Sequence, residues 1–347
     1  GSGVSAWDYW LTQGDAIVRY LVLSVWPYPL VFEYGPFLVT LGEALPFLVI
    51  TAALAGATFV ALWRVPWAGF LGLWFFALLA PTSLMPGTTQ MIVEHRMYLP
   101  LAAVSVVIVL ALHAWLGRGS FLPLAGLAAA LALATVARNQ DYRSELALWS
   151  ATVAERPRNA LAHANLGIAY VRLGRVEEAL RHYETAAQLG PRYPTTHYNH
   201  GLALVQAGRR EDALAAFLRA TTLKTDFSAA QAEAGLLLLH LGRNTEAIAC
   251  CEQALRVNPD DAGTHCTLAN ALFLARRVDE AFDHYGAALR LAPDSADTHY
   301  NRGNSLYLLG RWTEAAADYR RALLLRPEFP EARRNLEIAQ ARLRSAR

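Results

Sequence analysis

The chain has 347 residues, 54% of them hydrophobic, and a formal net charge of +2 at pH 7. This average covers two unlike parts, because residues 1–137 carry nine charged side chains and residues 138–347 carry 51. Neither part has the clustered basic face of a nucleic-acid-binding domain, which excludes nucleic acid as a partner. The composition predicts a membrane domain over residues 1–137, followed by a water-soluble domain.

The first apolar stretch of the chain, residues 20–32, is too short to cross a bilayer. It follows Arg19 and contains Pro27 and Pro29. We therefore expect an interfacial or re-entrant segment and not a membrane span.

Four later stretches are long and apolar enough to be transmembrane helices, which need about 20 residues to cross a core about 30 Å thick. They are Leu45 to Trp63, Trp67 to Met85, Tyr98 to Leu116, and the shorter, alanine-rich Phe121 to Ala137. The alternative is a set of buried helices in a soluble domain. Connections as short as residues 64–66 and 117–120 favour the membrane.

An even number of crossings would return the chain to the side on which it started. The segment before Leu45, the loop 86–97 and everything after residue 137 would then share one face. Arg64 and Arg118 lie in the two tight turns on the other face, and arginines in short loops favour the cytoplasm. We therefore predict that the soluble domain is exoplasmic, in the periplasm or its equivalent.

The soluble part repeats with a period of 34 residues, which is typical of tetratricopeptide repeats. Counting from Ala160, the twentieth position is alanine in all five repeats: Ala179, Ala213, Ala247, Ala281 and Ala315. A helix-ending proline recurs at Pro191, Pro259, Pro293 and Pro327, with Thr225 as the exception. The pattern predicts an all-α right-handed superhelix: a connecting half-repeat over 138–159, five repeats over 160–329 and a capping helix over 330–347.

Small residues recur where the two helices of a repeat should approach each other. These are the alanines above and Gly167, Gly201, Gly235 and Gly303 on the first helix, helix A. Aromatic side chains at the twenty-fourth position should fill the space that they leave: Tyr183, Phe217, Tyr285 and Tyr319, with Cys251 in the third repeat. A second set, Gly174, Gly208, Gly242 and Gly310, should form left-handed turns between the helices.

Helix A should line the concave surface, so its polar residues are candidates for binding a partner protein. Asparagine occupies the sixth position in three repeats and in the cap: Asn165, Asn199, Asn301 and Asn335. A carboxamide both donates and accepts hydrogen bonds, so such a ladder can bind an extended peptide backbone. It resembles the asparagine ladder of O-GlcNAc transferases, although Glu233 and Thr267 interrupt it. Helix capping or solvation is the alternative role for these asparagines.

Neither the histidines nor the cysteines are spaced for a metal site. His163, His197, His265 and His299 recur at the fourth position, too far apart to share an ion, and we interpret them as replacements for an aromatic residue. Cys250, Cys251 and Cys266 lack zinc spacing and are expected to be buried packing residues, or to form one disulfide in an oxidising compartment. The Lys or Arg and Asn pattern of a co-chaperone carboxylate clamp is absent, which disfavours chaperone tails as partners.

Two short sequence strings in the membrane part indicate a family more specifically than hydropathy does. They are WPYPLVFEYG, from Trp26 to Gly35, and EHRMYLP, from Glu94 to Pro100. Together with the preceding PTSLMP and the repeats, they resemble the transmembrane and tetratricopeptide-repeat-containing O-mannosyltransferases and their bacterial relatives, which are polytopic GT-C glycosyltransferases. The chain departs from this family at Glu33, where aspartate is more common.

The resemblance implies transfer of a sugar, typically mannose, from a polyprenyl or dolichyl phosphate to protein hydroxyl groups on the exoplasmic side. Residues that would bind the donor lie in the two strings: Glu33, Tyr34, Glu94, His95, Arg96 and Tyr98. Arg96 suits a lipid phosphate because a guanidinium binds it through two hydrogen bonds, and Glu94 could orient it. Alternatively, residues 94–96 only anchor a helix at the headgroups.

The family's catalytic acid would lie in an earlier exoplasmic loop, so we expect it upstream of this chain and assign no catalytic residue. No cofactor is implied beyond the lipid-phosphate-linked sugar, which would be a substrate. The leading hypothesis is therefore the C-terminal part of a membrane glycosyltransferase whose repeats bind acceptor proteins. The alternative is a membrane-anchored scaffold without enzymatic activity.

Overall fold

The computed structural model describes residues 6–25, 40–84, 98–141 and 143–345. All the regular elements in these ranges are helices, which confirms the all-α prediction. The chain divides into two compact units, Gly1–Pro191 and Arg192–Arg347. The predicted domain limits at residues 137 and 159 stay predictions.

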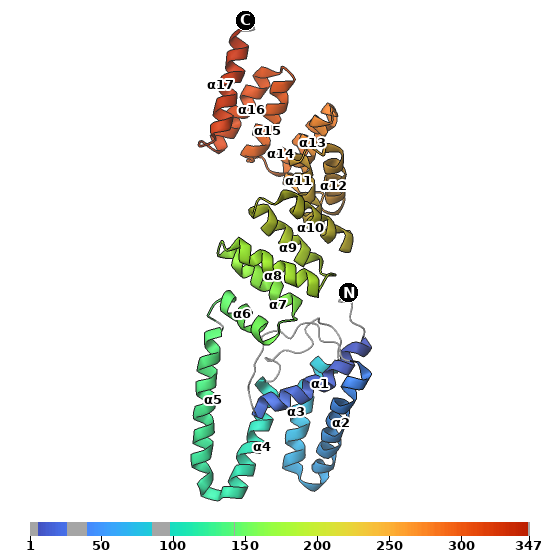
Figure 1. Cartoon of the computed structure of the whole chain (residues 1–347), viewed down its shortest axis with the longest axis vertical. Coiled ribbons are helices and arrows are strands. Elements are labelled where there is room, and N and C mark those ends of the chain that lie inside the picture. The colour runs from blue at the N-terminus through green and yellow to red at the C-terminus, as the bar shows by residue number, and fades with distance from the viewer. Residues whose placement is uncertain (1–5, 26–39, 85–97, 142, 346–347) are drawn as a thin grey trace. The chain divides into compact units, whose positions relative to one another are not determined.

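The first unit begins with a group of apolar helices. They are α1 (Ala6–Val25), α2 (Leu41–Arg64), α3 (Pro66–Leu84), α4 (Tyr98–Leu116), the short 3-10 helix η2 (Gly117–Ser120) and α5 (Phe121–Asp141) (Figure 1). Thr40 and Glu43 form a capping box at the start of α2, in which the Thr40 amide donates to a Glu43 carboxylate oxygen at 2.8 Å. Pro66 then begins α3, which limits the turn before it to Val65.

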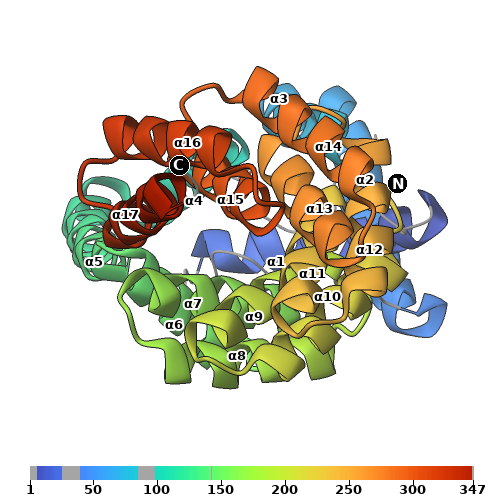
Figure 2. The ribbon, with the colours of Figure 1, turned by 90° about the horizontal axis from the view of Figure 1, so that it is seen from above.

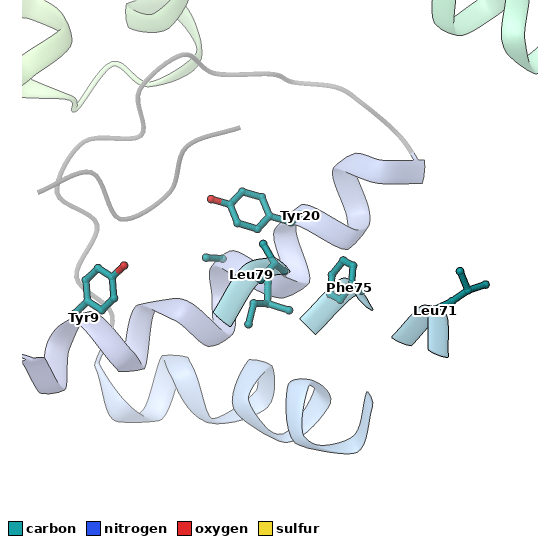
Figure 3. Close-up of a cluster of buried hydrophobic side chains, with 7 residues drawn as sticks. Tyr9, Tyr20, Leu71, Phe75 and Leu79 are labelled. Atoms are coloured by element: carbon teal, nitrogen blue, oxygen red, sulfur yellow. The ribbon is translucent and has the colours of Figure 1, made fainter. Parts of the chain in front are cut away.

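Helix α1 packs across α3. Its Tyr9 and Tyr20 are buried in one cluster with Leu71, Phe75 and Leu79 of α3 (Figure 3). The expected segment 20–32 therefore contains the end of a 20-residue helix that starts at Ala6. Residues 26–32 lie outside the described part of the chain.

Large apolar side chains cover the outside of these helices. On α2, for example, Val49 is 60% exposed and Phe59 is 65% exposed. By length and composition, two helical runs could cross a membrane, Leu41–Arg64 and Val104–Leu133, and Pro66–Leu79 is a shorter apolar run. The four predicted membrane crossings remain a prediction, because length and composition alone do not place a helix in a bilayer.

The repeats form helical hairpins in both units. The first unit ends with α6 (Glu145–Glu155), α7 (Ala160–Arg172) and α8 (Val176–Leu189). The second contains α9 (Pro194–Gln206), α10 (Arg210–Leu223), α11 (Ser228–His240), α12 (Asn244–Val257), α13 (Ala262–Leu274), α14 (Val278–Leu291), α15 (Ala296–Leu308), α16 (Trp312–Leu325) and α17 (Pro330–Ser345). Odd-numbered helices from α7 to α15 are the A helices of their repeats, and α17 continues their row.

In the second unit the A helices form the inner layer. Contacts join α11 to α13, α13 to α15 and α15 to α17, in addition to the contacts within each hairpin. Figure 2 shows α13 and α15 on the inner side of the stack, with α14 and α16 outside them. The helices α11, α13, α15 and α17 therefore lie side by side.

The close approach predicted between the helices of each repeat is confirmed. A Cβ atom added to Gly201 would lie 2.6 Å from a ring carbon of Phe217, and one added to Gly303 would lie 2.8 Å from Tyr319. These are sub-van-der-Waals distances, so any side chain would displace the aromatic ring. Cys251 occupies the equivalent place in the third repeat, opposite Gly235.

The turns between helices A and B also follow the prediction. Gly174, Gly208, Gly242 and Gly310 all have φ between 72° and 75°. In the fourth repeat Arg276 takes this position with φ 65°, a conformation that costs about 1–2 kcal/mol for a residue with a Cβ atom. The turn is therefore enforced there by the packing of the two helices and not by the local sequence.

Candidate functional site

The inner layer of the second unit presents one exposed large apolar side chain from each of its five helices. Their exposed fractions range from 37% to 69%, and they are Val205, Leu236, Leu274, Leu308 and Ile338. Four come from A helices and the last from α17. We call the surface that carries them the A-helix face.

Polar side chains at the sixth position of the repeat lie on the same helices as this apolar row. Asn199, Asn301 and Asn335 are half-buried in the second unit, and Asn165 is half-buried on α7 in the first unit. The amide of Asn301 points to the neighbouring repeat and donates to Cys266 Sγ at 3.5 Å. Polar groups for hydrogen bonding and apolar side chains for burial therefore occur on the same helices.

Glu233 holds the sixth position in the third repeat and is half-buried. Burial raises its pKa, and the charge of Asp261 raises it further. The pKa of Tyr198 is raised by burial and then by Glu233, which places the two side chains near each other. Within the described residues no cationic side chain forms an ion pair with Glu233, so this part of the face is acidic.

The fourth-position residues have a role that the sequence analysis did not predict. Five of the six donate a hydrogen bond to the carbonyl of the residue two positions beyond the end of the preceding helix. The pairs are His163 with Pro157 (3.1 Å), Gln231 with Thr225 (2.8 Å), His265 with Pro259 (2.9 Å), His299 with Pro293 (3.3 Å) and Arg333 with Pro327 (3.0 Å). These residues are therefore polar links between repeats and not simple replacements for an aromatic side chain.

Two of these histidines also pair with a histidine on helix B of the same repeat. His163 Nδ1 lies 3.0 Å from His182 Nδ1, and His265 Nδ1 lies 2.9 Å from His284 Nδ1. Because Nε2 of His163 and His265 faces a carbonyl oxygen, Nε2 carries the proton and Nδ1 accepts from the partner ring. Burial lowers the pKa of His182 and His284, and the partner histidines lower it further.

In the fifth repeat an aspartate replaces the second histidine. Asp318 is buried and accepts two hydrogen bonds from Arg302, at 2.7 Å from Nε and 2.6 Å from Nη2. His299 Nδ1 also lies 3.1 Å from Asp318 Oδ1. This cluster joins α15 to α16 behind the A-helix face.

A second polar network lies on the A-helix face itself, between α15, α16 and α17. Asn304 Oδ1 accepts from Tyr319 Oη at 2.8 Å and from Asn335 Nδ2 at 2.9 Å. Asn335 also donates to Tyr300 Oη at 3.3 Å. Asn304 was missed by the sequence analysis, although its counterpart one repeat earlier, Asn270, bonds in the same way to Tyr285. Asparagine recurring at the ninth position was the signal that could have identified it.

The predicted donor-binding residues belong to the N-terminal, apolar part of the chain. Glu33, Tyr34, Glu94, His95 and Arg96 lie outside the described residues. Tyr98 is the first residue of α4, and its side chain is not among those described. Their roles stay predictions.

All three cysteines are free thiols, and Cys251 and Cys266 are buried as expected. Among the described residues no group of three or more His, Cys, Asp and Glu side chains is arranged to hold a metal ion.

Comparison with protein families identifies the repeats. Tetratricopeptide repeat profiles match residues 198–262 and 296–329, and a TPR repeat profile matches residues 169–208 and 277–310. The chain therefore contains tetratricopeptide repeats, a module that binds partner or peptide ligands through protein–protein interaction. The comparison with curated proteins gave no match.

Several solved structures are similar to part of this chain. YrrB, described as a TPR protein with an unusual peptide-binding site, is 21% identical, with a TM-score of 0.47 over 53% of this chain and 95% of its own. MamA from Desulfovibrio magneticus RS-1 is 23% identical, with a TM-score of 0.45 over 48% and 94% of the two chains. The pilF protein of Pseudomonas aeruginosa is 21% identical, with a TM-score of 0.49 over 61% and 94%.

Proposed function

We propose that the A-helix face of the second unit binds an extended segment of a partner protein. The observation that carries this proposal is that each inner helix presents one exposed apolar side chain, accompanied on several of these helices by a half-buried amide. Apolar contacts would supply most of the binding free energy. The amides would bond to the peptide backbone, which every sequence presents.

Two asparagines of this face provide the test. Replacing Asn199 and Asn301 together with alanine should weaken peptide binding roughly 5- to 100-fold, because each lost hydrogen bond costs about 0.5–1.5 kcal/mol. The probe is a set of peptides selected on the full-length chain from a random library of about 12 residues, roughly 40 Å when extended. Their affinities are then measured for both proteins by fluorescence anisotropy.

The matched control is Asn258→Ala, at the exposed end of helix B in the third repeat. This variant should bind the selected peptides like the original protein. The proposal fails if no peptide is selected, or if the double variant binds them with unchanged affinity.

We also propose that residues 41–141 anchor the repeats to a membrane. Support comes from the exposed apolar surface of α2 and of the run Val104–Leu133. Trp63 and Trp115, which are 80% and 79% exposed, stand next to the turns that carry Arg64 and Arg118. Tryptophan with arginine just beyond it is typical of the membrane–water boundary. Under the positive-inside rule these turns face the cytoplasm and the repeats are exoplasmic.

The second candidate is a glycosyltransferase of the O-mannosyltransferase type, of which this chain would form the C-terminal part and the repeats would bind the acceptor protein. The strings WPYPLVFEYG and EHRMYLP favour it, because the guanidinium of Arg96, two residues before Tyr98 in the sequence, suits a lipid phosphate. In the enzyme that contains this chain, Arg96→Ala should abolish sugar transfer from a polyprenyl-phosphate donor, whereas Arg118→Ala should not. Unchanged transfer by the Arg96 variant would exclude this role.

A further inference from the structure

The A-helix face ends in a pocket of about 250 Å³ between α15, α16 and α17. It is lined by Asn304, Tyr307, Leu308, Tyr319, Asn335 and Ile338. The volume is several times the roughly 30 Å³ that a water molecule occupies in the liquid, so it can take an amino-acid side chain.

The polar part of this pocket has one unused donor and one unused acceptor. Asn304 Oδ1 already accepts from Tyr319 and Asn335, but Asn304 Nδ2 has no partner among the described residues. Asn335 Nδ2 donates twice, whereas Asn335 Oδ1 accepts from no described group. One N–H and one C=O are what a single peptide unit needs in order to be bound at both of its polar groups.

The two amides offer one free donor and one free acceptor in either of their two concerted orientations. If oxygen and nitrogen are exchanged in both, Asn304 Nδ2 donates to Asn335 Oδ1 and to Tyr319 Oη. The free groups are then the oxygen of Asn304 and an N–H of Asn335. The pair still offers one donor and one acceptor.

The wall of the pocket is apolar and its rim is basic. Leu308 is 69% exposed and Ile338 is 40% exposed. Arg334 and Arg342 lie four residues before and after Ile338, so they flank it on the same side of α17. Both are exposed and neither has an ion-pair partner among the described residues.

The charges of the neighbouring elements agree with a basic rim. Helix α17 carries four arginines against two glutamates, Glu331 and Glu337. On the facing helix, the carboxylate of Asp297 is neutralised by Arg326 at 2.6 Å. The acidic part of the face, at Glu233 on α11, belongs to an earlier repeat.

We infer that this pocket, which we call the terminal pocket, selects an apolar side chain next to a carboxylate in the bound protein segment. The apolar side chain would lie against Leu308 and Ile338, its peptide unit would bond to Asn304 and Asn335, and the carboxylate would face Arg334 and Arg342. This inference rests on the proposed function and adds a sequence preference to it. It also places the acidic and apolar residues of the segment at the α17 end of the face.

The selected peptides provide the test. They should be enriched in Asp or Glu beside Leu, Ile or Phe, and Ile338→Glu should weaken their binding about tenfold or more by placing a like charge beside the carboxylate. The double variant R334Q/R342Q should weaken binding and reduce its dependence on salt, since exposed charges are screened at high ionic strength. The matched control is Leu324→Glu, because Leu324 is 71% exposed on α16 and does not line the pocket.

The outcomes separate this inference from the proposed function. Peptides that depend on Asn199 and Asn301, but show no acidic–apolar preference and bind the Ile338→Glu protein normally, would overturn the terminal pocket and leave the proposed function intact. Because the R334Q/R342Q changes are confined to exposed side chains, this variant decides the question even if Ile338→Glu does not fold. Failure to select any peptide would overturn both.

Discussion

Replacing Arg302 with alanine is expected to lower the free energy of unfolding by about 3–5 kcal/mol, the cost of leaving a buried charge without its partner. The side chain of Asp318 is 7% exposed, and Arg302 supplies two of its hydrogen bonds. The polar group that the structure then describes beside the carboxylate is His299 Nδ1, 3.1 Å from Asp318 Oδ1. Denaturant unfolding followed by circular dichroism measures the loss.

A matched control is available on the surface of the same repeat. Arg311 forms an ion pair with Glu314 at 2.6 Å in which both side chains are about half exposed, so Arg311→Ala should cost less than about 1 kcal/mol. Adding Asp318→Ala to the Arg302→Ala variant should cost less than the two single changes together, because it removes the stranded charge. Equal losses from Arg302→Ala and Arg311→Ala would contradict a buried pair.

The stability of the repeats is expected to fall as the pH drops below about 6.5, the ordinary pKa of histidine. In the folded chain the pKa of His182 and His284 is lower, first through burial and then through their histidine partners. The unfolded chain therefore binds more protons in this range, which favours unfolding. At about pH 7.5 and above, the histidines are neutral in both states and contribute no pH dependence.

The geometry explains why protonating both histidines of a pair is costly. One proton can be shared by each pair, but two would place N–H groups face to face at 3.0 Å in the pair of His182 and at 2.9 Å in that of His284. Near His284 the carboxylates of Glu252, Glu280 and Asp283 act in the opposite direction without cancelling the shift.

The measurement is the midpoint of denaturant unfolding between about pH 7.5 and pH 5.5, above the range in which most carboxylates titrate. The variant H182Q/H284Q keeps a hydrogen-bond donor at each site but cannot titrate, so its midpoint should change less with pH. His240→Gln is the matched control, since His240 is exposed on α11. An identical slope in H182Q/H284Q and in the original protein would refute the role of the pairs.

The parts of the fold that the sequence predicted depend on contacts within one repeat. Gly201 and Phe217 stand at fixed positions of the same hairpin, so their packing recurs wherever the two residue types recur. The same holds for the left-handed turn at Gly208. Arg276 shows the limit, because it adopts the glycine conformation without being glycine.

The candidate site was predicted only in part. The sixth-position asparagines marked the A helices as the binding surface, but Asn304 gained its role from Tyr319 on the next helix and from Asn335 31 residues later. The pairing of His265 with His284 was also not predicted. The second histidine does not recur in every repeat, and Asp318 replaces it in the fifth.

The sequence by itself determined the order of the helices, the 34-residue repeat and the apolar character of the first 137 residues, because each follows from local periodicity and composition. Only the tertiary structure decided how α1 packs on α3 and which amide groups on the A-helix face remain free. Those features arise where side chains from separate helices meet. A hydrogen bond formed there occupies a donor and an acceptor. The sequence shows that both groups exist, but not that they are bonded to each other.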